Sequence, residues 1–126
     1  MQPNVIFDII MTRWHGKPIA WLQESVSTPP FSKEARVEAG FLLRQLQQGQ
    51  RLGLPQCRPM PVLGARCHEL RVQDVDATWR VLVRLDPDAI VVAGILRKKT
   101  RRTPAAWLEA CRRRLAIYDW DREKET

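Results

Sequence analysis

The stretch TWRVLVRLDPDAIVVAGILRKKTRRTPAAW, Thr78 to Trp107, decides the fold. Its first eight residues alternate with a period of two, which is typical of a β-strand with one buried face. One face of that strand carries Trp79, Val81, Val83 and Leu85, and the other carries Arg80, Leu82 and Arg84. The DPD turn leads into Ala89–Leu96, which is apolar throughout, as in a central strand covered on both faces. The stretch therefore predicts a β-hairpin at the centre of a sheet.

A strongly basic corner follows the second strand of this hairpin. Five positive side chains occupy the six residues from Arg97 to Arg102, interrupted only by Thr100. Repulsion among these like charges opposes folding unless they are solvated or bind an anion. Pro104 then suits the first turn of a C-terminal helix. The residues of that helix at core-facing spacing are Leu108, Cys111, Leu115 and Tyr118.

The N-terminal half of the chain predicts a strand and a helix. Ile19–Leu22 is interpreted as a strand, and Ser32 as the N-cap of a helix that ends before Gly49. The buried stripe of this helix is predicted to be Ala35, Ala39, Leu42, Leu43 and Leu46. Residues 50–64 are rich in Pro and Gly and predict a loop folded over the sheet edge. Cys67–Val72 then predicts the strand that precedes the central hairpin.

This order of elements predicts an α+β fold. We expect a small, mostly antiparallel sheet, built from the N-terminal strand and a three-strand meander. Helices are expected to pack on one face, followed by the C-terminal helix. Residues 1–126 are expected to form a single domain, in which 1–16 are an extension of open role and 120–126 a frayed polar tail.

Charge and cysteine content limit the classes of partner and compartment. The net charge of +7 favours a polyanionic partner, either a nucleic acid or an acidic protein. No segment is long and apolar enough to span a membrane, and residues 1–16 lack the basic leader and cleavage site of a signal peptide. Three cysteines without a CxxC motif suit the reducing cytoplasm. The spacing of Cys57, Cys67 and His68 does not support a zinc site, and we predict no metal or cofactor.

The basic residues are predicted to form one electropositive patch. Arg80 and Arg84 share a strand face, Arg71 on the preceding strand reaches the same region, and Lys98 to Arg102 lie where the sheet ends. Guanidinium groups match phosphate oxygens in two-point contacts, so the patch suits a sugar-phosphate backbone. Solvated surface charge is the alternative for any single residue. The further residues predicted to contact this nucleic-acid backbone are Arg84, Arg97, Arg101, Arg102, Arg112 and Arg113, the last two at the rim.

His68 is a candidate catalytic base, although strand alternation places it with Leu70 and opposite Arg71. The simpler interpretation is a structural histidine, in the core or at the sheet edge, whose ring nitrogens are hydrogen-bonded within the protein. Glu69, or a lysine whose pKa is lowered by cationic neighbours, is the alternative base. Trp79 and Trp107 have the type of ring that stacks on bases, but the alternation of Trp79 favours the core.

The same segments resemble a known family. HELRV, TWRVLVRL, AIVVAGIL, the corner KKTRRTP and the helix EACRRRLAIYD are similar, in this order, to the RelE/ParE superfamily toxins of type II toxin–antitoxin systems. The likeness is closest to the phage-derived, HigB-like branch and runs from about Lys17 to Asp119. Glu69 stands where some nuclease members have a lysine, and the base-stacking tyrosine has no clear equivalent, since Tyr118 lies too far along the last helix.

The resemblance implies a compact RelE-like toxin that a cognate antitoxin binds in a hetero-oligomer. It also implies cleavage of mRNA at the ribosome without a metal, by attack of the 2′-hydroxyl on the adjacent phosphate. By position, it implies catalytic roles for Arg71, Arg80, Lys98 and Lys99. Gyrase inhibition, known for other members of the superfamily, and a non-catalytic basic module that binds nucleic acid are the alternatives.

Overall fold

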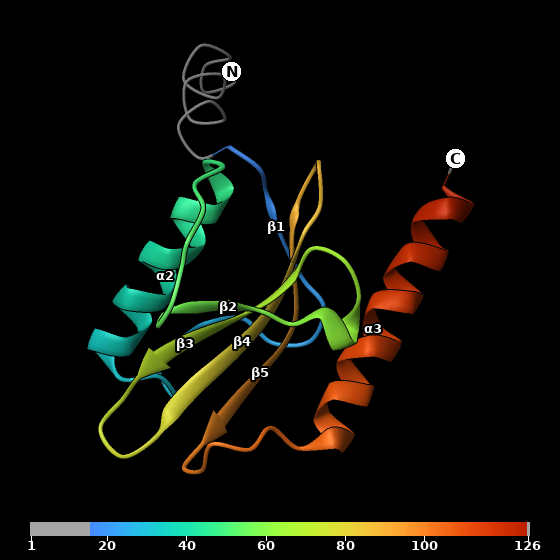
Figure 1. Cartoon of the computed structure of the whole chain (residues 1–126). Coiled ribbons are helices and arrows are strands. Elements are labelled where there is room, and N and C mark those ends of the chain that lie inside the picture. The colour runs from blue at the N-terminus through green and yellow to red at the C-terminus, as the bar shows by residue number, and fades with distance from the viewer. Residues whose placement is uncertain (1–15, 126) are drawn as a thin grey trace.

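The computed structural model describes residues 16–125 and is built around a five-stranded sheet (Figure 1). The strand order is β1-β5-β4-β3-β2; β1 is parallel to β5, and all other neighbours are antiparallel. The elements in chain order are β1 (Ile19–Trp21), α2 (Lys33–Gln47), β2 (Cys57–Pro59), the 3-10 turn η1 (Pro61–Leu63), β3 (Cys67–Gln73), β4 (Thr78–Leu85), β5 (Ile90–Lys98) and α3 (Ala105–Lys124). The predicted α+β class and the meander are confirmed.

The two helices lie on opposite faces of the sheet (Figure 1). On the α2 face, the predicted helix stripe packs against Val81, Val83 and Val92. On the α3 face, Cys111 and Leu115 pack against Leu82 and Val91. The expectation that helical packing covers one face of the sheet therefore holds for α2. Helix α3 covers the other face and forms a third layer. The reason is β5, whose residues from Ile90 to Ile95 are buried and so need a cover on each side.

Helix α2 begins and ends where the sequence predicts. The Ser32 side chain accepts a hydrogen bond from the Ala35 N–H at 3.0 Å, which satisfies one free donor of the first turn. The helix ends at Gln47, and Gly49 adopts a φ of +83° that a residue with a side chain rarely takes. The five predicted core residues of the helix are all buried.

Two segments differ most from the sequence prediction. Residues 57–59, predicted as loop, form the edge strand β2 and pair with Leu70–His68 of β3. Three residues flanked by prolines give no recognisable period, so the strand has no signal of its own. Helix α3 continues to Lys124 instead of fraying from residue 120, because Arg122 pairs with Asp88 and donates to the Tyr118 hydroxyl. The predictions for residues 1–15 lie outside the described residues.

A β-bulge fits β5 against α3. Leu82 pairs with Gly94 and Val83 with Val92, so Ala93 is the extra residue. A Cβ added at Gly94 would lie 2.6 Å from the Cys111 Sγ and 3.2 Å from the Trp107 Nε1. The bulge therefore turns a residue without a side chain toward the helix, which allows close packing.

Replacing Gly94 with alanine is expected to lower the free energy of unfolding by about 1–3 kcal/mol, because the added methyl overpacks the helix contact. Gly40 is the matched control, since nothing lies within 4 Å of its added Cβ. Gly40→Ala is expected to raise the same free energy by about 0.5–1 kcal/mol through helix propensity. Urea unfolding of both variants measures the difference. Equal effects would contradict the close packing at Gly94.

Candidate active site

A fully buried carboxylate lies at the centre of the candidate site. Glu69 of β3 has no exposed surface, and its Oε1 lies 2.9 Å from the Arg80 Nη1 and 3.1 Å from the Arg58 Nε. The Arg71 Nε is 3.9 Å from the same oxygen. We call Arg58, Arg71, Arg80 and Lys98 the basic cluster. A carboxylate is buried at acceptable cost only where it is paired and hydrogen-bonded, and Arg58 and Arg80 meet this need.

Strand pairing explains why these side chains meet. Arg71 and Arg80 are direct partners across β3 and β4, and Arg58 of β2 is the direct partner of Glu69. Like charges placed opposite each other destabilise a sheet. Glu69, two residues before Arg71 on the same strand face, relieves that repulsion. The cluster faces the α3 side, since Leu70 and Val81 between its members belong to the α2-side core.

Lys98 adds a buried cation without a counter-ion. Its side chain is almost completely buried, and its Nζ has no hydrogen-bond partner in the described structure. The Arg80 Nε is buried and unpartnered in the same way. Burial lowers the pKa of Lys98, the charges of Arg80 and Arg102 lower it further, and the Glu69 carboxylate partly opposes them. Four cationic groups surround one carboxylate, which leaves three positive charges in excess when all are protonated.

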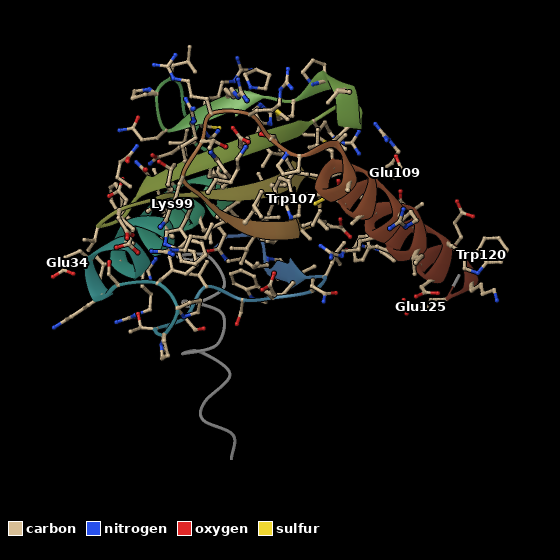
Figure 2. The ribbon with its side chains drawn as sticks, turned by 90° about the horizontal axis from the view of Figure 1, so that it is seen from below. Glu34, Lys99, Trp107, Glu109, Trp120 and Glu125 are labelled. Carbon is tan, nitrogen blue, oxygen red and sulfur yellow. The ribbon has the colours of Figure 1, made fainter. Side chains whose placement is uncertain are left out.

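The loop between β5 and α3 extends this charge to the surface. Figure 2 shows Lys99 on that loop and Trp107 in the first turn of α3. Lys99, Arg101 and Arg102 are exposed. The positive charge of Arg101 contributes to a lowered pKa of Arg71, although burial is the larger cause. Thr103 donates from its hydroxyl to the Glu69 Oε2 at 3.5 Å, a long hydrogen bond that ties the loop to the cluster.

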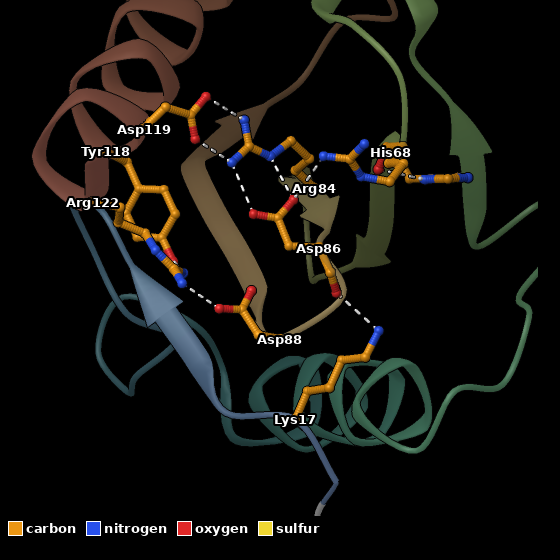
Figure 3. A network of polar contacts seen from close by, with 9 residues as sticks. Lys17, His68, Arg84, Asp86, Asp88, Tyr118, Asp119 and Arg122 are labelled. Atoms are coloured by element: carbon orange, nitrogen blue, oxygen red, sulfur yellow. Dashed lines mark hydrogen bonds and ion pairs between the residues drawn. The ribbon is translucent and has the colours of Figure 1, made fainter. Parts of the chain in front are cut away.

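Arg84, predicted to bind RNA, is engaged in a separate ion-pair network (Figure 3). Its guanidinium lies 2.7 Å from the Asp86 carboxylate and 2.7 Å from the Asp119 carboxylate. The hydrogen bonds that Arg84 donates to Asp119 and Asp86 raise its pKa. The residue thus joins β4 to α3, and its charge is already balanced.

The remaining predicted RNA contacts are spread over the molecule. Arg97 pairs with Asp76 at 2.6 Å and lies over the Trp79 ring, on the α2 face. Arg112 pairs with Glu109 and donates to the Val62 carbonyl at 2.8 Å, which fastens α3 to η1. Arg113 is exposed on α3.

His68 lies on the opposite side of the sheet from the basic cluster. It lines a cavity of about 430 Å3 together with Lys17, Cys57 and Leu85, next to the end of α2. Its Nδ1 is 3.3 Å from the Arg66 carbonyl oxygen. Cys57 and Cys67 belong to different hydrophobic cores, and residues 16–125 contain no group of three or more metal-ligating side chains. The structure therefore unites Arg71, Arg80 and Lys98, but not His68.

Most of the chain matches a known protein family. Residues 30–116, which include α2, the basic cluster and most of α3, match the family described as phage-derived protein Gp49-like (DUF891). The chain belongs to the Gp49-like family. This is a RelE/ParE-type family of toxins from toxin–antitoxin systems, so an antitoxin is the implied partner. No curated protein and no solved structure matches the chain.

Three features of the candidate site of this Gp49-like protein were not predicted from the sequence. Arg58 lies in the strand that was predicted as loop, so nothing indicated that it pairs with Glu69. Glu69 was predicted as a departure from a lysine and as an alternative base, not as the carboxylate at the centre of the cluster. The contact of Thr103 depends on the path of an irregular loop.

Neither helix among residues 16–125 is long and apolar enough to cross a bilayer.

Two arginine variants of the Gp49-like protein separate charge with a structural role from charge that is predicted to bind RNA. Arg84→Gln is expected to lower the free energy of unfolding by about 2 kcal/mol, because Asp86 and Asp119 lose a shared donor. Its affinity for an RNA oligonucleotide is expected to stay within twofold. Arg102→Gln is the matched variant, which should retain stability and lower the slope of log affinity against log salt by about one. The reverse pattern would show that Arg84 contacts RNA.

Proposed function

We propose that this Gp49-like toxin is an endoribonuclease that cleaves mRNA at the ribosome without a metal ion. The observation that carries the proposal is the basic cluster, in which Arg71, Arg80 and Lys98 converge around Glu69 on one sheet face. With Lys98 neutral, Arg58, Arg71 and Arg80 against Glu69 still leave two excess positive charges in a partly buried site, which favours a bound phosphodiester. A preorganised set of cations is also what stabilises charge that develops on a phosphorus centre.

The proposed reaction is an internal transfer of the phosphate. The 2′-oxygen loses its proton and attacks the adjacent phosphorus, and the bond from phosphorus to the 5′-oxygen breaks. The leaving oxygen takes a proton from water, and the base that accepted the 2′-proton returns it to the hydroxide that remains. The products are a 2′,3′-cyclic phosphate and a 5′-hydroxyl. Arg71 and Arg80 would donate to the non-bridging oxygens, where negative charge grows in the transition state. Glu69 acts as a positioning residue, since it holds the guanidinium of Arg80 at 2.9 Å.

Lys98 is the proposed general base. Glu69 is fully buried in ion pairs, His68 lies across the sheet, and an arginine stays protonated. A lysine can accept the proton only as a neutral amine, and burial, Arg80 and Arg102 all lower the pKa of Lys98 toward that state. Its Nζ has no competing partner in the described structure. RNA would reach it by displacing the loop that the Thr103 contact holds.

The exposed charges outside the cluster support the ribosome as the place of action. Lys99, Arg101 and Arg102 would hold phosphates on either side of the cleaved bond, and Arg113 offers a further contact. The net charge of +7 favours approach to a ribosome, which is the largest polyanionic surface that carries mRNA. A cognate antitoxin would neutralise the toxin by covering this basic surface.

Inducible expression with parallel labelling of protein and DNA synthesis tests the proposal. Protein synthesis should stop first, with mRNA fragments that end in a cyclic phosphate and DNA that remains intact. A variant with Arg71→Ala and Lys98→Met should permit growth at equal protein levels. DNA breakage with continued translation would instead identify a gyrase inhibitor. Growth arrest by the double variant would contradict the site assignment.

A further inference from the structure

We propose that a cavity at the open edge of β3 binds a guanine base of the RNA, beside the phosphate held by the basic cluster. This inference rests on the proposed ribonuclease function and deepens it, because it assigns a base-specific contact. The cavity measures about 330 Å3 and is lined by Glu38, Pro55, Gln56, Arg71 and Gln73. Ligand cavities span roughly 300–1,000 Å3, so the cavity lies at the small end of that range, as suits a single base.

The short strand β2 creates this opening. Strand pairing between β2 and β3 ends at Cys57 and Leu70, while β3 continues through Arg71 to Gln73. Beyond that point, the Arg71 N–H donates to the Gln56 carbonyl at 2.8 Å, which fixes the loop at the cavity wall. Glu38 reaches the same cavity from α2. Three separate segments thus supply its polar walls.

Arg71 joins the cavity to the proposed reaction centre. It belongs to the basic cluster through Glu69 and also lines the cavity. A guanidinium has five N–H donors, so Arg71 can face Glu69 and still offer donors to a ligand. Its side chain is 31% exposed, in contrast to the buried Arg80. A base in the cavity would therefore sit next to the phosphate that Arg71 and Arg80 are proposed to hold.

The charged side chains of the cavity wall match the hydrogen-bond donors and acceptors of guanine better than those of adenine. Guanine presents acceptors at O6 and N7, which suit the donors of Arg71. It also presents N–H donors at N1 and N2, which suit the carboxylate of Glu38. Adenine keeps the N7 acceptor but has a donor at N6 in place of O6 and an acceptor at N1 in place of the N1 donor, so each of the two contacts would lose one hydrogen bond. No hydrogen bond or ion pair engages the Glu38 carboxylate within the described chain, so that carboxylate is available to a ligand.

The other lining residues complete a site for a flat polar ring. The Gln73 Oε1 accepts from the Thr78 hydroxyl at 3.2 Å, which orients the Gln73 amide so that its NH2 group remains as a donor. Gln56 adds a second amide, and Pro55 a rigid apolar ring against which a base can pack. Recognition of single-stranded RNA commonly combines such packing with hydrogen bonds to base edges.

Binding to non-cleavable RNA tests this inference. The probes are 2′-O-methyl hexanucleotides of uridine that carry one internal guanosine or one internal adenosine, with affinity measured by fluorescence anisotropy. The wild-type protein is expected to bind the guanosine probe about tenfold more tightly than the adenosine probe. Glu38→Gln should reduce this preference to less than twofold. Glu34→Gln, one turn earlier on the exposed face of α2, is the control that should retain it.

The outcomes separate this inference from the proposed function. Equal affinity for the two probes, or a guanosine preference that survives Glu38→Gln, would overturn the guanine site while leaving the ribonuclease proposal intact. Failure of both probes to bind would overturn the two together. Circular dichroism of each variant shows whether a lost preference reflects misfolding, and a folded Glu38→Gln protein without the preference supports the site.

Discussion

Replacing Lys98 with arginine is expected to lower the rate of RNA cleavage by roughly 100- to 10,000-fold, the range contributed by general acid–base catalysis. Arginine retains the positive charge but cannot take up a proton at neutral pH. The wild-type rate should rise with pH as Lys98 loses its proton and then level off. Because the pKa of Lys98 is lowered from 10.5, this plateau should begin at a lower pH than for an ordinary lysine. Single-turnover cleavage between pH 6 and 10 measures both effects.

Lys124→Arg is the matched control for this experiment. It makes the same substitution on α3, where the ammonium lies 4.9 Å from the Trp120 ring and far along the helix from the site. The rate and the pH profile of this variant should equal those of the wild type. A Lys98→Arg protein that cleaves at the wild-type rate with an unchanged profile would show that Lys98 is not the base. In that case its role would be that of a fixed positive charge.

The part of the site that the sequence predicted rests on strand periodicity. Alternation in Thr78–Leu85 separated Arg80 from its apolar neighbours, and the simplest strand register brought Arg71 into the same region. The structure places Arg71 directly opposite Arg80. The same alternation placed His68 across the sheet from Arg71. These inferences succeeded because side-chain direction in a strand is a local property with a fixed period of two.

The part that the sequence did not predict depends on contacts between distant segments. Arg84 has the same local pattern as Arg80, yet one pairs with Asp119 on α3 and the other with Glu69. No local rule distinguishes them, since each partner is chosen by tertiary packing. The placement of α3 on the second face follows from the burial of β5 on both sides. An apolar strand alone does not indicate which helix covers which face.

The largest effect on stability is expected at Glu69. Glu69→Gln removes the one negative charge among Arg58, Arg71 and Arg80 and leaves buried positive charge without compensation. Breaking a buried ion pair in this way costs about 3–5 kcal/mol. Domains of this size have a total stability of about 5–15 kcal/mol, so the variant should lose a large part of it. Urea unfolding at low ionic strength measures the loss.

Glu109→Gln provides the control, because it removes a carboxylate from an exposed ion pair with Arg112. Exposed pairs contribute about 0–1 kcal/mol, so little stability should be lost. Phosphate ions should partly restore the stability of Glu69→Gln, and by more than they stabilise the wild type, since an anion can replace the lost carboxylate among the guanidinium groups. A variant as stable as Glu109→Gln would mean that the arginines do not depend on Glu69. The basic cluster would then be held by the strands alone, and the positioning role proposed for Glu69 would be wrong.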